Sequence, residues 1–282
     1  MARRSIDVLC WLLLLCLATG CTVSPREKAV QQGLSHGFQQ VLFHTTDFDL
    51  FALYRPPAAH ADDQSPSVSG PRLRVYIEGD GRAWITRSRP SSDPTPHTPV
   101  ALRLAIADPA HDGRDALLYL ARPCQYVRGN NSRNCVPKYW TNARLAPEVI
   151  ESLDTAISMA KQWTEAREVI LTGFSGGGGA AALVAARRQD VVFLASVAGN
   201  LDSATWTRLL GVSPLDASLD PITVAPAVAH IPQRHWSGAQ DTIVPAAVGA
   251  GFCRATGQPK AHAIVPGMEH DGPWETVWDY RY

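Results

Sequence analysis

The sequence predicts an α/β protein whose central, mostly parallel sheet is covered by helices on both faces. Short apolar runs rich in β-branched and aromatic residues alternate with helix-length segments over most of the 282 residues. Hydrophobic residues make up 45% of the chain, which is enough for a large core. Strands that are separated by helices favour parallel pairing. No internal repeat or linker divides the sequence, so we expect one domain over residues 38–282.

The charge balance gives no indication of a nucleic-acid partner. The chain carries 26 Lys and Arg against 26 Asp and Glu, and no basic stripe is interleaved with aromatic residues. We expect no metal and no other cofactor, and the sequence identifies no protein partner.

The first 20 residues indicate export rather than folded structure. Arg3 and Arg4 precede an apolar run, VLCWLLLLCLA (8–18), which is shorter than the roughly 20 residues that cross a bilayer. The segment ends in LATGC, which resembles the lipobox of bacterial lipoproteins, with Ala18 where leucine is usual. The resemblance implies cleavage after residue 20 and acylation of Cys21. An ordinary secretory signal peptide with cleavage nearby is the alternative.

A polar stretch, 21–37, follows and is expected to be a tether. Thr22, rather than Asp, comes after the cysteine, and this resembles the outer-membrane sorting pattern of lipoproteins. The expected location is the bacterial cell envelope, on the periplasmic side, with the protein bound to a membrane through its N-terminal lipid. In a host with two membranes, that membrane is expected to be the outer one.

The predicted elements after residue 37 alternate between strands and helices. Strands are expected where short runs are dense in Val, Ile, Leu, Tyr and Phe, and helices where apolar residues recur at helical intervals. A Pro-, Ser- and Asp-rich stretch at 56–71 indicates a surface loop. In chain order we expect an antiparallel strand pair within 41–56, a strand at 73–79, a helix at 99–107, a strand at 116–121, a helix at 145–161, a strand at 168–171, a helix after Ser175, and strands at 191–199, 234–239 and 261–267.

Residues 171–182, LTGFSGGGGAAA, place one serine where a predicted strand turns into a predicted helix. Residues 173–177 satisfy G-x-S-x-G, a weak signal alone, but the strand before and the helix after supply the context that the motif requires. At such a turn the serine is strained, and neighbouring Cβ atoms would clash. We expect Ser175 to be a nucleophile. A flexible linker is the alternative, and a phosphate loop is excluded because G-x-x-x-x-G-K-[ST] is absent.

A serine nucleophile needs a base within hydrogen-bond reach and an acid that orients the base. Asp241 in SGAQDTIVP and His270 in VPGMEHDG each follow a predicted strand. Since ligands of parallel sheets bind beyond the carboxyl ends of the strands, we expect these residues to meet Ser175 there. Asp202 is the second choice for the acid. The residues that compete less well are His97, His111, His230, His235, His262 and Asp271.

The oxyanion of an acyl-transfer transition state requires hydrogen-bond donors. We expect one from the backbone N–H of Gly176, directly after the serine, and a second from the loop EGDGRAW that follows the strand at 73–79. Asp80 is the favoured donor through its amide, Gly81 is possible, and a plain glycine turn is the remaining interpretation. A carboxylate would oppose an oxyanion, so the Asp80 side chain is expected to point away or to pair with Arg82.

Export would place the protein in an oxidising compartment, where cysteines pair. Two cysteines lie in the signal segment and Cys21 would carry lipid, so Cys124 and Cys135 are the expected disulfide. Cys253 is then left free and is expected to be buried. Two unpaired thiols at 124 and 135 are the alternative.

The order and context of these motifs resemble the α/β-hydrolase family over nearly all of residues 38–282. The resemblance implies Ser175 as nucleophile, Asp241 as orienting acid and His270 as general base. The usual H-G oxyanion loop stands here as residues 78–81, EGDG.

No large cap domain is evident in the sequence. Only residues 200–232 could fold over the site. Their apolar side chains either line an acyl pocket or pack in the ordinary way: Trp206, Leu209, Leu210, Val212 and Leu215.

The expected function is that of an exported serine hydrolase that cleaves a carboxylic ester of a small-molecule acyl substrate through an acyl-enzyme. Amidase, peptidase and acyltransferase chemistry use the same triad and stay open. A non-catalytic binding lipoprotein on the hydrolase scaffold is an alternative of a different class, and a structural protein of the cell envelope is a third.

Overall fold

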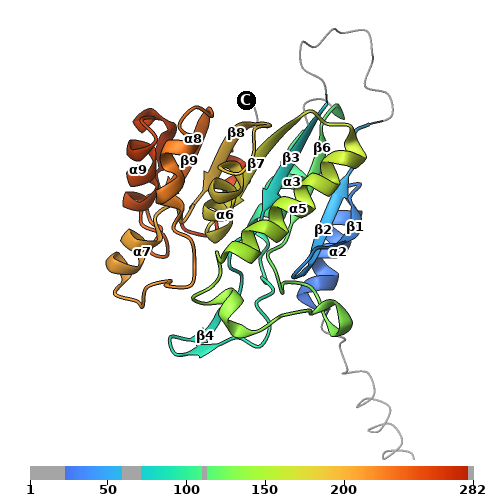
Figure 1. Ribbon diagram of the computed structural model, residues 1–282, viewed down its shortest axis with the longest axis horizontal. Helices are drawn as coiled ribbons and strands as arrows, with labels where there is room; N and C mark the ends of the chain where they lie inside the picture. The colour runs from blue at the N-terminus through green and yellow to red at the C-terminus, as the bar shows by residue number, and fades with distance from the viewer. Residues whose placement is uncertain (1–22, 59–70, 110–112, 279–282) are drawn as a thin grey trace, which may run out of the picture.

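A computed structural model describes residues 23–58, 71–109 and 113–278 (Figure 1). The expected signal segment with Cys21, and most of the expected loop at 56–71, lie outside the described residues. Export and acylation therefore stay predictions.

Within the described residues, an eight-stranded sheet forms the centre of the molecule, in the order β1-β2-β6-β3-β7-β8-β9-β10. β1 pairs antiparallel with β2, and β2 antiparallel with β6. All later neighbours are parallel, which confirms the predicted mostly parallel sheet. The strands are β1 (Gln39–His44), β2 (Asp49–Arg55), β3 (Arg72–Ile77), β6 (Ala116–Leu120), β7 (Glu168–Phe174), β8 (Val191–Val197), β9 (Gln233–Gly238) and β10 (His262–Val265), with a separate antiparallel pair, β4 (Trp84–Thr86) and β5 (Arg89–Pro90).

The central strands are buried on both faces, which explains their nearly uninterrupted apolar sequences. The exception is Arg74 in β3, which is buried and donates hydrogen bonds to the carboxylates of Asp108 and Asp115. A buried charge that is paired in this way avoids the cost of an unpaired one.

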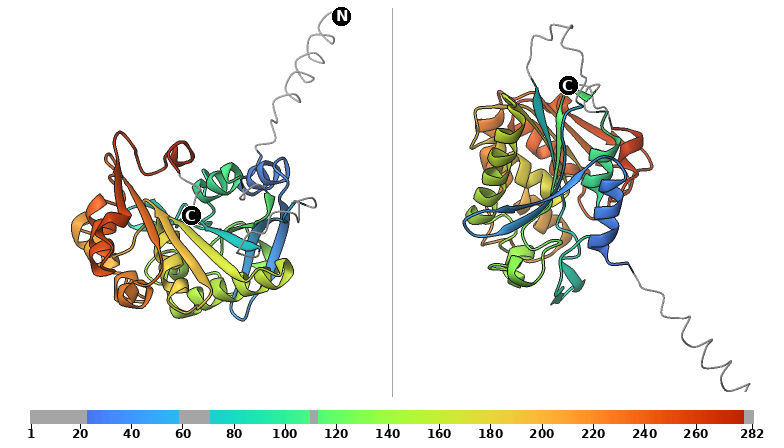
Figure 2. Two further views of the ribbon diagram at one scale, coloured as in Figure 1. Left: turned by 90° about the horizontal axis from the view of Figure 1, so that it is seen from above. Right: turned by 90° about the vertical axis from the view of Figure 1, so that its right-hand side faces the viewer.

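Helices cover both faces of the sheet, as predicted (Figure 2, left view). One apolar core lies between the sheet and α5, α6, α8 and α9, and a second lies under α2 and α3. The helices are α2 (Pro25–Leu34), α3 (Val100–Ala107), α5 (Pro147–Thr164), α6 (Gly176–Ala185), α7 (Ser203–Leu210), α8 (Ala225–Val228) and α9 (Ala246–Ala255), with 3₁₀ turns at Gly129–Asn131, Pro137–Trp140, Pro221–Val224, Pro259–Ala261 and Trp274–Thr276. None of the described helices has both the length and the apolar character needed to cross a bilayer.

The predicted tether at 21–37 differs from the structure, because most of it is the helix α2. Ser24 caps this helix: its hydroxyl accepts from the Glu27 amide at 3.2 Å, and its own amide donates to the Glu27 carboxylate at 2.8 Å. Ala29 and Gly33 are buried against the domain, and a Cβ at Gly33 would lie 2.7 Å from a methyl of Leu53. The polar composition concealed a narrow packing face made of two small residues.

The other predicted elements agree closely with the structure, within a few residues at their ends. The sequence reading missed the short β4–β5 hairpin after β3, and the helices between β8 and β10. Residues 200–232 contain α7 and α8 rather than a cap, and no cap domain is present among the described residues.

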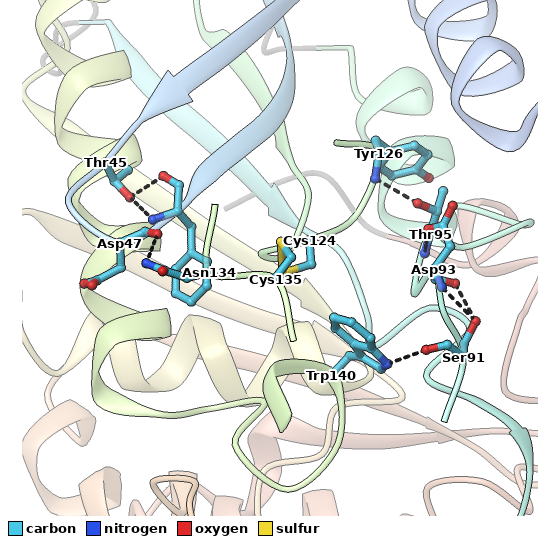
Figure 3. Close-up of a disulfide and its surroundings, with 11 residues drawn as sticks. Thr45, Asp47, Ser91, Asp93, Thr95, Cys124, Tyr126, Asn134, Cys135 and Trp140 are labelled. Carbon is cyan, nitrogen blue, oxygen red and sulfur yellow. Dashed lines mark hydrogen bonds between the residues drawn. A yellow bond between two sulfur atoms is a disulfide. The ribbon is translucent and has the colours of Figure 1, made fainter. Parts of the chain in front are cut away.

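A disulfide joins Cys124 and Cys135, as predicted, and Cys253 is free and buried in α9. Figure 3 shows that the disulfide lies between two other chain segments. On one side, Asn134 donates to the carbonyl of Asp47 in the β1–β2 turn at 2.8 Å. On the other side, the amide of Tyr126 donates to the Thr95 hydroxyl at 2.8 Å. The disulfide loop therefore connects the sheet edge with the loop that leads into α3.

Removing the disulfide is expected to destabilise the fold without changing its topology. The two cysteines are 11 residues apart, and closing a loop of this order contributes about 3 kcal/mol through the entropy of the unfolded chain. The double variant Cys124→Ser, Cys135→Ser should lower the free energy of unfolding in urea by about that amount. An equal unfolding free energy for variant and wild type would contradict the expectation, and Cys253→Ser serves as the thiol control.

Candidate active site

Three parallel strands end at one edge of the sheet and bring Ser175, Asp241 and His270 together. Ser175 follows β7, Asp241 follows β9, and His270 follows β10. Residues that lie 95 positions apart in the sequence are thereby within hydrogen-bond distance of each other.

Ser175 lies in a tight turn between β7 and α6. Its backbone adopts φ 52° and ψ −123°, a combination that is strained for any residue with a Cβ. The Ser175 amide donates to the Val197 carbonyl at 3.1 Å, and its own carbonyl accepts from the Asn200 amide at 2.9 Å. Gly177 allows the helix to start here, because a Cβ at this position would lie 2.3 Å from the Ile77 carbonyl oxygen. The glycines of the motif thus serve close packing, not flexibility.

His270 bridges the other two side chains. Its Nε2 lies 3.0 Å from the Ser175 hydroxyl, and its Nδ1 lies 2.8 Å from Asp241 Oδ2. The other oxygen of Asp241 accepts from the backbone amides of Ile243 and Val244, each at 2.8 Å. The Asp241 carboxylate has 0% exposure and is fixed by three donors. A carboxylate only accepts hydrogen bonds, so Nδ1 carries the proton and Nε2 is free to accept from the serine.

The loop after β3 is held by bonds to both polar groups of Gly79. The Gly79 amide donates to the Glu78 carboxylate at 2.9 Å, and its carbonyl accepts from Gln125 Nε2 at 2.8 Å. In a trans peptide the C=O and the following N–H point in opposite directions, so the Asp80 N–H points away from Gln125. Among the described residues, no acceptor binds the backbone N–H of Asp80, Gly81 or Gly176.

Gly81 completes this loop in a conformation that only glycine adopts easily. Its φ is +63°, and a Cβ there would lie 2.1 Å from the Pro94 carbonyl oxygen. The glycine next to Asp80 is therefore required by geometry.

The expected pairing of Asp80 with Arg82 is wrong. The Asp80 carboxylate pairs with Arg144 and, at 3.3 Å, with Arg122, and it lies over Gly176 rather than pointing away. Although burial raises the pKa of Asp80, the charges of Arg144 and Arg122 outweigh it and hold the pKa below its usual value. Two cations thus face one anion beside Ser175, and they offset the repulsion that a lone carboxylate would exert there.

Glu78 lies buried under the same loop. Burial raises its pKa to about 7, although the amides of Gly79 and Ala101 and the Tyr119 hydroxyl favour the charged form. The Glu78 carboxyl group accepts a hydrogen bond from the Gly79 amide. Protonation of Glu78 therefore changes the strength of a hydrogen bond that holds the loop.

The three side chains open into a cavity of about 530 Å³. Apolar walls come from Phe174, Trp206, Val244 and Trp84. Of the apolar residues expected to line an acyl pocket, only Trp206 does so, whereas Leu209 and Val212 are exposed to solvent. Within the described residues, no group of three or more His, Cys, Asp or Glu side chains could hold a metal ion.

Three of the competing residues bind other partners. Asp202, the second choice for the acid, caps α7 by accepting the Thr205 amide at 2.8 Å. His235 is buried and bonded to Ser196, and His262 contacts Ser237 at 2.9 Å. The remaining ones are His97 and Asp271, which line the cavity, His230 in the turn before β9, and His111, which lies outside the described residues.

Sequence reasoning missed the residues that support the loop at 78–81. Arg122, Gln125 and Arg144 lie between β6 and α5, in a stretch whose only regular structure is two 3₁₀ turns, and no motif marks them. The nearest signal was the cysteine at 124, which fixes this stretch and which was interpreted only as a disulfide partner.

No family model and no curated protein matches the chain. Solved structures do match it. The chain is 18% identical to a mutant of puromycin hydrolase, with a TM-score of 0.56 over 85% of this chain and 37% of that one. It is 14% identical to acylaminoacyl peptidase from Pyrococcus horikoshii, with a TM-score of 0.60 over 86% of this chain and 40% of the other. It is 12% identical to an α/β serine hydrolase without a lid from Xanthomonas campestris, with a TM-score of 0.52 over 85% and 88%.

These matches show that the chain has the α/β-hydrolase fold. The chain spans less than half of the puromycin hydrolase and of the acylaminoacyl peptidase. Identities this low establish the arrangement of the backbone and leave the activity to the site itself.

Replacing Glu78 by Gln is expected to change how stability depends on pH. Because the folded-state pKa is raised to about 7, the native protein holds a proton that the unfolded chain releases above about pH 4.3. Wild-type stability should therefore fall between about pH 4.3 and 7, by up to about 4 kcal/mol from this group. Urea unfolding at pH 5 and pH 8 measures the change, and Glu78→Gln should lose that part of it. An identical pH dependence in both proteins would overturn the assignment.

Proposed function

We propose that this protein is a serine hydrolase that cleaves a carboxylic ester through an acyl-enzyme. The observation that carries the proposal is the chain of hydrogen bonds from Ser175 Oγ to His270 Nε2, at 3.0 Å, and from His270 Nδ1 to Asp241 Oδ2, at 2.8 Å. This is the arrangement in which a weak hydroxyl nucleophile becomes reactive.

In the proposed reaction, Ser175 Oγ attacks the ester carbonyl while His270 Nε2 takes the hydroxyl proton. The imidazolium that forms is stabilised by Asp241. The tetrahedral intermediate collapses, the C–O bond to the leaving alcohol breaks, and His270 gives its proton to that alcohol. Water then attacks the acyl-serine with His270 as base, and the acid is released with Ser175 regenerated.

The proposed oxyanion donors are the backbone N–H groups of Gly176 and Asp80. Neither has an acceptor among the described residues, and Gly176 follows the nucleophile at the N-terminus of α6, where the helix dipole favours negative charge. The Gln125 bond to the Gly79 carbonyl favours Asp80 over Gly81, because it sets the orientation of the peptide to which the Asp80 N–H belongs.

Hydrolysis of an amide is the second candidate. Two of the similar structures are named a puromycin hydrolase and an acylaminoacyl peptidase, and peptidases cleave amides. The apolar walls of the cavity fit an acyl group in either case. A nitrophenyl ester and a nitroanilide with the same acyl group separate the two. The ratio of their rates of hydrolysis by hydroxide alone gives their intrinsic difference in reactivity. The ester proposal expects the ratio of kcat/KM for the ester to kcat/KM for the anilide to exceed that intrinsic ratio.

We also propose that the protein is exported and held to a membrane of the bacterial cell envelope by acylation of Cys21. The support is the sequence of residues 1–21 alone. Mass spectrometry of the protein from membranes tests this: a diacyl or triacyl cysteine as the first residue is expected, and an unmodified N-terminus contradicts it.

Replacing Ser175 or His270 by Ala is expected to abolish hydrolysis, and Asp241→Asn to lower kcat by about 10⁴-fold. A fluorophosphonate probe should label the wild type and not Ser175→Ala. Ser237→Ala is the matched control, because Ser237 also contacts a histidine, at 2.9 Å, but outside the cavity. Absence of labelling in the wild type would indicate a non-catalytic binding scaffold, and equal labelling of wild type and Ser175→Ala would show that Ser175 is not the reactive residue.

Replacing Gln125 by Leu is expected to lower kcat by about 10- to 100-fold with little change in KM, because a misplaced oxyanion donor weakens only the transition state. The measurement is steady-state kinetics on a short soluble ester. Gln258→Leu is the control, since Gln258 also donates to backbone carbonyls, at 2.8 Å, but away from the site. If both variants lose activity only in proportion to lost stability, Gln125 has no role in the site.

A further inference from the structure

The β4–β5 hairpin projects from the edge of the molecule at which the candidate site lies (Figure 1). Its base is fixed: the Ser91 amide donates to the Ala83 carbonyl at 2.9 Å, and Trp140 Nε1 donates to the Ser91 carbonyl at 3.1 Å. Its first strand is exposed, with Trp84 at 43% and Ile85 at 40% exposure. Two large apolar side chains are thus held in water by a rigid base, which is costly unless something covers them.

The hairpin is also strongly basic. Residues 81–92 carry Arg82, Arg87 and Arg89 and no acidic residue, in a chain whose net charge is zero. All three arginines are exposed, and none forms an ion pair among the described residues. Exposed Trp and Ile surrounded by unpaired arginines match the interface of an anionic membrane, where aromatic rings lie at the headgroups and cations meet phosphates.

Further exposed apolar side chains lie in the cavity lining and at the end of α7. Trp84 lines the cavity itself, and so does Ile243, which is 51% exposed. Leu209 and Val212 are exposed at the end of α7, and α7 lies at the same end of the molecule as β4 in Figure 1. Two of these exposed apolar side chains, Trp84 and Ile243, thus belong to the cavity lining.

The start of the described chain lies at this end too. Figures 1 and 2 place the first turn of α2 at the end of the molecule from which the hairpin projects. α2 is capped at Ser24 and packed on the domain. Ser24 follows Cys21 by three positions in the sequence, and three residues can span at most about 10 Å. A lipid on Cys21 would therefore hold this end of the domain, and not another, close to the bilayer.

We propose that the β4–β5 hairpin docks on an anionic membrane surface, with Trp84 and Ile85 among the headgroups and with Arg87 and Arg89 against lipid phosphates. The cavity of the candidate site then opens toward the bilayer. This inference uses the proposed anchor at Cys21 but does not depend on the proposed hydrolysis.

The test measures lipid contact without any turnover. The full chain is reconstituted into vesicles of phosphatidylglycerol and phosphatidylethanolamine, with an environment-sensitive fluorophore at Ile85→Cys. The control carries the same fluorophore at Gln162→Cys, an exposed site near the end of α5, with unsubstituted chain as the labelling background. Nitroxide-labelled lipids should quench the probe at 85 at least about fivefold more than the probe at 162, because an interfacial side chain enters the headgroup region by about 5–10 Å.

The double variant Arg87→Gln, Arg89→Gln should bring the quenching at 85 down toward that at 162, while it leaves hydrolysis of a soluble ester unchanged. Equal quenching at both sites in vesicle-bound protein would overturn the proposal, as would failure of the chain to bind the vesicles. If the fluorescence of the probe at 85 changes with the amount of protein per vesicle and not with the nitroxide-labelled lipid, the hairpin forms a contact between copies of this chain instead. The variants are compared at temperatures equally far below their own Tm, so that partial unfolding is not mistaken for loss of docking.

Discussion

The strained turn at Ser175 is the constraint on which the rest of the site depends. A serine at φ 52° is unfavourable by about 1–3 kcal/mol and persists only where its neighbours leave no alternative. Here the amide of Ser175 is bound to Val197 at the end of β8, and its carbonyl to the amide of Asn200. The helix after it packs so closely on β3 that only glycine fits at 177. Neighbouring strand ends and one helix start therefore hold this single residue in its strained conformation.

Two carboxylates lie near His270, and their surroundings give them different tasks. Asp241 is fully buried and receives its hydrogen bonds from two backbone amides and the imidazole. Asp80 is held by Arg122 and Arg144, whose charges keep it ionised and directed along the cavity wall. Asp241 can thus stabilise an imidazolium on His270, while the charge of Asp80 is offset by its neighbouring arginines. The arrangement permits an acidic residue directly beside the proposed oxyanion donor, where the Coulomb repulsion of an unpaired one would be large.

The sheet, its order of elements and the three converging side chains could be read from the sequence, because each depends on local pattern: buried parallel strands are uniformly apolar, and a G-x-S-x-G turn requires its flanking strand and helix. The failures have a common cause. α2 packs through Ala29 and Gly33, which carry almost no hydrophobic signal. Asp80 pairs with Arg122 and Arg144 instead of the nearby Arg82, because the chain folds back after β6 and brings these two arginines to it. Such contacts depend on tertiary structure, and spacing along the chain does not encode them.

Cys253 has a consequence for the covalent integrity of the folded protein. Burial within α9 raises the pKa of its thiol to about 12, so the nucleophilic thiolate is on the order of one molecule in 10⁵ at neutral pH. Thiol–disulfide exchange begins with attack by a thiolate on a sulfur that it can reach. The odd cysteine of the described residues therefore cannot scramble the bond between Cys124 and Cys135 once α9 has packed. Any mispairing has to arise earlier, while the chain is still unfolded.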